Sequence, residues 1–269
     1  QVDKLTAAQV QALTTGQVAA LTEAQVGKLT TTQVAALSAK QIVGMETADL
    51  AALSSDQLQA LSASAVAALS TAQVASLTTA QVSKLTANQV KSLSGTQVAA
   101  LTEAQVGELT TAQVSVLSAT QVKAMETADV AKLSTAQIQA VSASAVAAMS
   151  TAQVKALTTT QAEKLTAGQV ASLSATQVAG LETEDLAKFS SSQLQALNAT
   201  TVAALSTAQV AALTTDQIDK LTATQVKALT TAQVASLTAT QVPKLTTTQV
   251  AALTATQIKG LETADLAAL

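Results

Sequence analysis

The stretch LTTAQVASLTATQV, residues 229–242, states one phrase twice at a spacing of eight residues: Leu-[Ser/Thr]-x-x-Gln-Val. The same phrase, with small changes, fills the chain from Leu5 to Leu269. Self-similarity at a fixed period is typical of a repeat protein, whose units contact mainly their neighbours. The sequence therefore predicts one continuous array over residues 1–269, which we interpret as a fragment of, or a subunit within, a longer assembly.

We call each eight-residue unit an octad and label its positions a to h, with Leu5 at position a. Position a is apolar throughout, and position f is Val, Ile or Leu except at Ala162. An uninterrupted helix does not fit this pattern, because eight residues advance about 80° beyond two full turns and the apolar stripe would wind into water. An uninterrupted strand does not fit either, because positions a and f are five apart and point to opposite faces.

Positions b and e identify the local structure. Position b is Ser or Thr and position e is Gln in most octads, as in Thr110 and Gln113. This S/T-x-x-Q spacing is a capping box, in which the hydroxyl accepts from the N–H at e and the Gln accepts from the N–H at b. The apolar residues that flank it, such as Leu5 with Val10, form the accompanying hydrophobic staple. Each octad thus carries a complete signal to begin a helix, as Thr110, Gln113 and Val114 do in theirs.

A new helix start every eight residues limits each helix to about positions c to h. We therefore predict an all-α solenoid of very short capped helices, with positions a and f in a narrow core and c and d facing water. Small residues at g and h would allow close approach between coils. The alternative is a β-solenoid, which would need Gly, Asn, Asp or Pro at regular turns. Pro243, at position g, is compatible with a short helix because it lies near the end of its octad.

Four octads replace the usual pair at b and e by acids and begin at Met45, Met125, Leu181 and Leu261, always a whole number of octads apart. Their carboxylates are weak candidates for Ca²⁺ ligands: Glu46, Asp49, Glu126, Asp129, Glu182, Glu184, Asp185, Glu262 and Asp265. Ca²⁺ takes about six to eight oxygens, so each acid pair falls short of a site, and acids in a first helical turn also suit the helix dipole. We predict no metal site. Gly44, Gly180 and Gly260 precede three of these octads and resemble left-handed helix ends.

The composition narrows the possible functions. The chain has no Cys and no His, and all of its basic residues are Lys. No setting for a nucleophile or a general base is recognisable, so we expect neither an enzyme nor a cofactor. Clustered basic residues and aromatics are missing, which argues against nucleic-acid binding. No apolar run approaches the roughly 18 residues of a membrane span.

The phrase LSTAQVAALTTDQI, residues 205–218, resembles octapeptide tracts of very large secreted bacterial surface proteins, which are adhesin-like or RTX-associated. The resemblance implies secretion to the cell surface and a role as a structural scaffold, either as a fibre-forming subunit or as an adhesin stalk. The alternative is a binding module that presents a Thr-rich face, with residues such as Thr30, Thr31 and Thr32, to ice, glycan or mineral.

The ends of the array lack a polar capping octad, which solenoids normally carry. We therefore expect Leu5, Val10, Leu261 and Leu266 to be only half covered within one copy. A second copy could cover them in register, and such a head-to-tail contact grows an open filament. End-to-end self-association is the partner that the sequence predicts.

Overall fold

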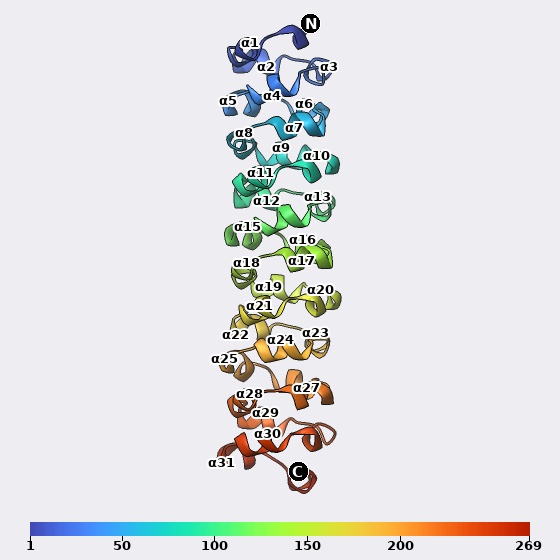
Figure 1. Ribbon diagram of the computed structural model, residues 1–269, viewed down its shortest axis with the longest axis vertical. Coiled ribbons are helices and arrows are strands. Elements are labelled where there is room, and N and C mark those ends of the chain that lie inside the picture. Colours follow the sequence, from blue (N-terminus) through green and yellow to red (C-terminus); the bar gives the residue numbers. More distant parts are fainter. The chain divides into compact units, whose positions relative to one another are not determined.

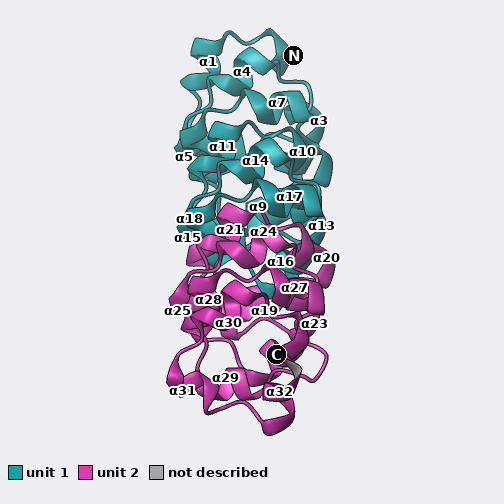
Figure 2. Cartoon of the chain, turned by 60° about the horizontal axis from the view of Figure 1, so that its bottom comes forward, with its two compact units in different colours: residues 1–145 teal, residues 146–269 magenta. Residues whose placement is uncertain are grey.

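The computed structural model describes residues 1–267 and 269 and divides the chain into two compact units, Gln1–Ala145 and Val146–Leu269 (Figure 2). Each unit consists of α-helices four to six residues long and one short 3-10 helix, and the described residues contain no strand. The fold is thus all-helical, as predicted, and the β-solenoid alternative is wrong.

The helices of the first unit follow one another at intervals of one octad (Figure 1). They are η1 (Val2–Lys4), α1 (Ala7–Gln11), α2 (Thr15–Ala19), α3 (Glu23–Val26), α4 (Thr31–Ala35), α5 (Ala39–Val43), α6 (Thr47–Ala52), α7 (Ser55–Ala60), α8 (Ala63–Ala67), α9 (Thr71–Ser76), α10 (Thr79–Lys84), α11 (Ala87–Ser92), α12 (Gly95–Ala99), α13 (Glu103–Gly107), α14 (Thr111–Ser115), α15 (Ala119–Ala124), α16 (Thr127–Lys132) and α17 (Thr135–Ala140). The next helix, α18 (Ala143–Ala148), contains the boundary between the units.

The second unit continues the same interval. Its helices are α19 (Thr151–Lys155), α20 (Thr159–Lys164), α21 (Ala167–Ala171), α22 (Ala175–Ala179), α23 (Thr183–Ala187), α24 (Ser191–Ala196), α25 (Ala199–Ala203), α26 (Thr207–Ala211), α27 (Thr215–Lys220), α28 (Ala223–Ala228), α29 (Thr231–Ala235), η2 (Val242–Lys244), α30 (Thr247–Ala252), α31 (Ala255–Ile258) and α32 (Thr263–Ala268).

The predicted capping box forms the start of nearly every helix. At α14 the N–H of Gln113 donates to the Thr110 hydroxyl at 3.2 Å, and the N–H of Thr110 donates to Gln113 Oε1 at 2.7 Å. Some helices end where position a adopts an extended conformation, as at Leu61. Others end one residue earlier in a tighter turn, as at Ala36, whose N–H donates to the carbonyl of Gln33. The helix start is therefore set by local side chains, while the helix length is set by the next capping box.

Helices three octads apart lie against each other within each unit, for example α12 against α15 and α21 against α24. Side-chain hydrogen bonds between successive layers join residues 28 to 31 apart in the sequence, as between Gln113 and residues Leu85 and Val82. One turn of the superhelix, called a coil below, therefore contains between three and four octads. This number was not predicted from the sequence.

Positions a and f form the core of both units, and Val114 and Leu117 are typical buried members. The expectation for the chain ends is half right. Leu5 is half-buried and Leu266 is 48% exposed, but Val10 is only 1% exposed and Leu261 only 8%. The prediction for Val10 and Leu261 is wrong, because the residue's own coil and a single neighbouring coil are enough to bury each side chain.

The three glycines that precede acidic octads are not left-handed, contrary to the prediction. Gly44 has φ −76° and Gly180 has φ −84°, and the described residues include no glycine with positive φ. Their small size serves packing between coils. A Cβ on Gly44 would overlap Cγ2 of Thr15, one on Gly180 would lie 2.5 Å from Cγ2 of Thr151, and Gly260 faces Thr231 in the same way. Position h thus meets position c of an octad in the preceding coil.

Pro243 changes its own octad more than predicted. Residues 237–244 contain the 3-10 helix η2, with Pro243 in its first turn, in place of an α-helix. The missing proline N–H removes the bond that position g otherwise makes to position c, which Gly27 makes to Glu23 at 2.9 Å. The capping pair of Thr238 and Gln241 nevertheless forms.

Candidate functional site

The Gln at position e is the polar side chain that recurs most often in the interior of both units. In α5, Gln41 Oε1 accepts from the N–H of Ser38 at 2.8 Å and so completes the capping box. Its Nε2 donates to the carbonyls of Val10 at 3.0 Å and Leu13 at 2.8 Å, both in the preceding coil. One buried amide therefore begins its own helix and binds the end of another. We call the series of these bonds the glutamine ladder.

The glutamine ladder has the same register in each unit, from position e to positions f and a of octads in the preceding coil. In the first unit its members are Gln33, Gln41, Gln57, Gln73, Gln81, Gln89, Gln97, Gln105, Gln113, Gln121 and Gln137. In the second unit they include Gln177, Gln193, Gln209, Gln217, Gln225, Gln233, Gln241, Gln249 and Gln257.

The double role explains why position e is Gln in most octads and Glu in none. A capping box accepts either residue, because only an acceptor is needed. The carbonyls at f and a need a donor, which a carboxylate lacks. A buried donor or acceptor without a partner costs about 1–3 kcal/mol, so each ladder bond matters to stability. The exclusion of Glu was the sequence signal for contacts between coils, and reasoning from the capping box alone missed it.

The acidic octads interrupt the ladder. Asp49, Asp129 and Asp185 occupy position e and are buried, whereas Glu46, Glu126 and Glu182 at position b are exposed. Asp129 completes a capping box, because the N–H of Glu126 donates to its Oδ2 at 3.2 Å. The pair Glu262 and Asp265 makes the same bond at 3.2 Å. These acids thus keep the capping function of Gln and lose its donor.

Burial is the main cause of a raised pKa at three of these carboxyls. It raises the pKa of Asp49, against the lowering effect of a hydrogen bond from the Glu46 backbone, and the charges of Glu46 and Glu23 raise it further. Burial likewise raises the pKa of Asp129, and the charges of Glu126 and Glu103 add to it.

Asp185 belongs to the same class, since burial is again the main cause of its raised pKa. A hydrogen bond with the Thr159 side chain lowers this pKa, the charge of Glu182 raises it, a bond from the Glu182 backbone lowers it, and the charge of Glu184 raises it. Asp185 is 2% exposed, and its Oδ2 has no hydrogen-bond partner.

Each acidic octad contains one exposed and one buried member of the weak Ca²⁺ candidates. The third octad also contains Glu184, which is exposed. Within residues 1–267 and 269, no three acidic side chains are grouped so that they could hold a metal ion. We assign no metal ligand among them, and Asp129 and Asp265 act as capping groups. Three further octads lack Gln at e: Ala65, Ala145 and Thr201 stand there, and their N–H groups bond to Ser62, Ser142 and Asn198.

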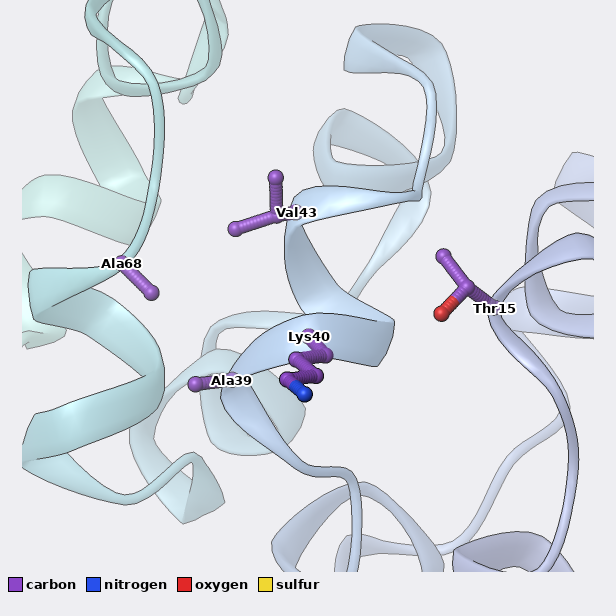
Figure 3. Close-up of a pocket in the computed structure, with 5 residues that line it drawn as sticks. All are labelled: Thr15, Ala39, Lys40, Val43 and Ala68. Carbon is purple, nitrogen blue, oxygen red and sulfur yellow. The ribbon is translucent and has the colours of Figure 1, made fainter.

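A shallow groove of about 350 Å³ lies in the first unit and is lined by Thr15, Ala39, Lys40, Val43 and Ala68. Val43, on α5, is 50% exposed and occupies position g, where other octads have small or polar residues or Pro243. Figure 3 shows that its side chain and that of Ala68 point into the same space. The groove is apolar, and the sequence did not single it out.

The Thr residues at the outer positions c and d are exposed or half-buried, as Thr31 and Thr32 illustrate. The same positions carry Glu23 and Ala24 in one octad and Gly95 and Thr96 in another. The outer surface is thus varied in residue type from octad to octad, and no uniform row of Thr follows from the register.

No helix in the part of the chain that the structure describes has the length and apolarity needed to cross a membrane. A family model described as the ALTTAQ repeat matches residues 42–79, 122–159, 178–215, 186–223 and 215–247. Together these segments cover just over half of the chain. No curated protein matches the sequence.

Proposed function

Because the chain belongs to the ALTTAQ repeat family, we propose that it serves as an extracellular structural scaffold, either a filament-forming unit or the stalk of a bacterial adhesin. The observation that supports this proposal is the glutamine ladder. The ladder uses the recurrent interior polar group of the octad to join one coil to the next. Its bonds are repeated in one register through each unit, as an extended spacing element requires.

Secretion and the adhesin context are part of the same proposal. They rest on the resemblance of the octapeptide phrase to tracts in large secreted surface proteins. A chain without Cys needs no disulfide chemistry to fold outside the cell. The varied residues at c and d favour a scaffold over a module that reads a regular surface.

End-to-end association is the assembly that this scaffold would use. Gln9, Gln17 and Gln25 form capping boxes, and the ladder register places their partner carbonyls before residue 1 of the sequence. At the other end, Val250 and Ile258 at position f are half-buried. A preceding coil, from a second copy or from a longer polypeptide, would supply carbonyls to the three amides, and a following coil would cover Val250 and Ile258.

The test is sedimentation and negative-stain microscopy of the purified chain over a range of concentrations. We expect concentration-dependent filaments, and we expect the triple change Gln9→Glu, Gln17→Glu and Gln25→Glu to suppress them. Each Glu keeps the capping acceptor and removes the donor that a joining coil needs. The matched control is Gln11→Glu, at exposed position g, which adds charge nearby without touching the ladder position.

A chain that stays monomeric at high concentration would contradict filament formation by this segment. In that case the stalk form of the proposal is tested by restoring a preceding coil. Fusion of residues 205–236, four regular octads, directly before Leu5 keeps the octad register and reaches the carbonyl 31 residues before Gln9. If Gln9, Gln17 and Gln25 gain hydrogen-exchange protection in the fusion, the array propagates as a scaffold requires, and if they do not, the scaffold proposal is wrong.

A further inference from the structure

The buried Asp side chains at position e pose a problem that the regular octads do not have. In a regular octad, Gln Nε2 donates to two carbonyls of the preceding coil, as Gln177 does to Val146 at 3.1 Å and Met149 at 2.8 Å. In that register the carbonyls that face Asp185 are those of Val154 and Leu157. An ionised carboxylate offers them only acceptors, so the bond between coils is lost and like partial charges face each other.

The unpartnered oxygen of Asp185 is the direct mark of this mismatch. Asp185 Oδ2 is buried and has no hydrogen-bond partner, while the regular octads fill the equivalent place with an amide donor, as Gln209 does. A carboxyl group becomes a donor when it takes up one proton, because the O–H then has the role that Gln Nε2–H has in the ladder. Asp is one methylene shorter than Gln, so the bond requires the coils to approach or the side chain to extend.

We propose that the octads of Asp49, Asp129 and Asp185 are proton-dependent joints, at which adjacent coils are held weakly while the carboxyl is ionised and more tightly after it takes a proton from solvent. The proposal concerns the stability of the array and stands whether or not the chain acts as a surface scaffold.

The acids around each joint act in the same direction, and the Lys residues of these octads, Lys132 and Lys188, stand at exposed position h. Around Asp49, α6 contributes the adjoining Glu46, α3 in the preceding coil contributes Glu23, and α9 in the following coil carries no charged residue. Around Asp129, the corresponding acids are Glu126 and Glu103. Glu23 precedes Asp49 by as many residues as Glu103 precedes Asp129. In both pairs, therefore, position c of one coil lies beside position e of the next coil. Repulsion between these acids favours protonation of the buried one.

Around Asp185, the neighbouring groups are Glu182 and Glu184 on its own octad and Thr159 on α20. Glu182 also pairs with Lys155 at 3.2 Å, with both side chains largely exposed. The other charged residues of α20, Glu163 and Lys164, pair with each other at 2.7 Å, and α26 on the other side carries no charge. No cation contacts the buried oxygen among the described residues.

The sign of the pH effect follows from linkage. A carboxyl whose pKa is higher in the folded than in the unfolded chain binds more protons when folded. Folding is therefore favoured as the pH falls through the folded pKa, and the gain is complete below the ordinary pKa of Asp, about 3.9. Exposed, ion-paired carboxylates have the opposite effect on the pH dependence of stability. The contribution of the joints must therefore be isolated by comparing variants.

The experiment compares the full chain with the variant Asp49→Gln, Asp129→Gln, Asp185→Gln in urea unfolding at about pH 7 and about pH 3.5, below the ordinary pKa of Asp, in the presence of a chelator. We expect the variant to have the higher midpoint at neutral pH, because Gln restores the donor. We expect the difference between the two proteins to shrink at the lower pH. The control Asp56→Asn removes an exposed acid at position d and should leave the pH dependence of the midpoint unchanged.

Two further measurements do not depend on how well the Gln variant folds. Gln89→Asp converts a regular joint, so its midpoint should fall at neutral pH and recover on acidification. Carboxyl NMR of the unmodified chain should show Asp185 titrating above the ordinary range. A midpoint difference between wild type and the triple variant that is the same at both pH values, or an Asp185 that titrates at or below about 3.9, would overturn the proposal.

Discussion

Gln113 and Leu85 lie 28 residues apart in the sequence and are joined by one hydrogen bond of 2.7 Å from the side-chain Nε2 to the backbone carbonyl. The same amide donates to Val82 at 2.8 Å, and its oxygen accepts from Thr110 at 2.7 Å. This side chain thus links local structure, the helix start, to long-range structure, the contact between coils.

The first prediction separates these two roles of Gln113. Gln113→Glu keeps the capping acceptor but loses the donor and places a carboxylate against two carbonyls. We expect it to lower the free energy of unfolding by about 1–3 kcal/mol at neutral pH. Loss of the cap alone, by Thr110→Ala, should cost about 1 kcal/mol. Urea titration of both variants provides the measurement.

The control for this comparison is Gln9→Glu. Gln9 forms a capping box with Thr6 but makes no bond to another coil, and it is exposed. We expect a change within about 0.5 kcal/mol. If Gln113→Glu were as mild as Gln9→Glu, the ladder would contribute nothing to stability and the capping box alone would account for the choice of residue.

The capping box, the helix in each octad and the core at positions a and f could be predicted from the sequence, because each depends on residues close to one another along the chain. Thr110, Gln113 and Val114 are enough to define them. The size of the coil could not, because it depends on how helices three octads apart pack. That packing is set by contacts such as Gly44 with Thr15, whose members belong to different coils and carry no local signal.

The second prediction tests this contact between coils. Gly44→Ala places a methyl group against Thr15 Cγ2, closer than two carbon atoms can approach, so the threonine must move. We expect a loss of about 1–3 kcal/mol, as for overpacking elsewhere. Gly16→Ala is the matched control, because a Cβ there meets no atom within 4 Å and the residue lies in α2.

For Gly16→Ala we expect a gain of about 0.5–1 kcal/mol, since Ala is favoured over Gly in a helix. The double change Thr15→Ser with Gly44→Ala removes the methyl group that causes the clash and should recover most of the loss. Thermal or urea unfolding of wild type and the three variants measures all of these effects. Equal stability of Gly44→Ala and Gly16→Ala would show that position h tolerates side chains against Thr.

The third prediction concerns the octad of Pro243. Replacement by Ala restores an N–H at position g, which can then donate to the Ala239 carbonyl as Gly27 does to Glu23. We expect residues 237–244 to become α-helical and the chain to gain about 1 kcal/mol, the net value of one hydrogen bond. Circular dichroism and urea titration are the measurements.

The reverse change, Ala211→Pro, places proline at the same position of α26. It should convert that octad to a shorter, tighter turn and cost about as much as Pro243→Ala gains, or up to about 3 kcal/mol if the helix cannot adjust. A Pro243→Ala variant with unchanged helix content would mean that packing, and not the missing donor, determines the 3-10 geometry.

The acidic octads show where prediction from the sequence was incomplete in another sense. The acid pairs could be located, and their capping role could be argued from the helix dipole. The burial of Asp49 and the exposure of Glu46 could not be predicted from the octad itself. Position e is buried by octads of other coils, so its burial depends on the size of the coil. Glu23 recurs at Glu103 with the same spacing to the next acidic octad, but that spacing gains a meaning only once the size of the coil is known.

The last prediction uses these neighbours. Glu23→Gln removes a charge that helps to raise the pKa of Asp49, so this pKa should fall. Because the folded carboxyl is then less reluctant to ionise, the chain should be slightly more stable at neutral pH, within about 0.5 kcal/mol, since Glu23 is exposed and screened. At a pH below both the folded and the unfolded pKa of Asp49 the effect should vanish.

The converse change is Thr159→Glu, which places an acid at the position c that faces Asp185 and removes a hydroxyl that lowers its pKa, so the pKa of Asp185 should rise. Carboxyl NMR titrations of Asp49 in Glu23→Gln and of Asp185 in Thr159→Glu measure both shifts. Glu108→Gln, at exposed position h, is the control and should move neither pKa. Shifts of the same sign in Glu23→Gln and Thr159→Glu would contradict the arrangement in which position c of one coil faces position e of the next.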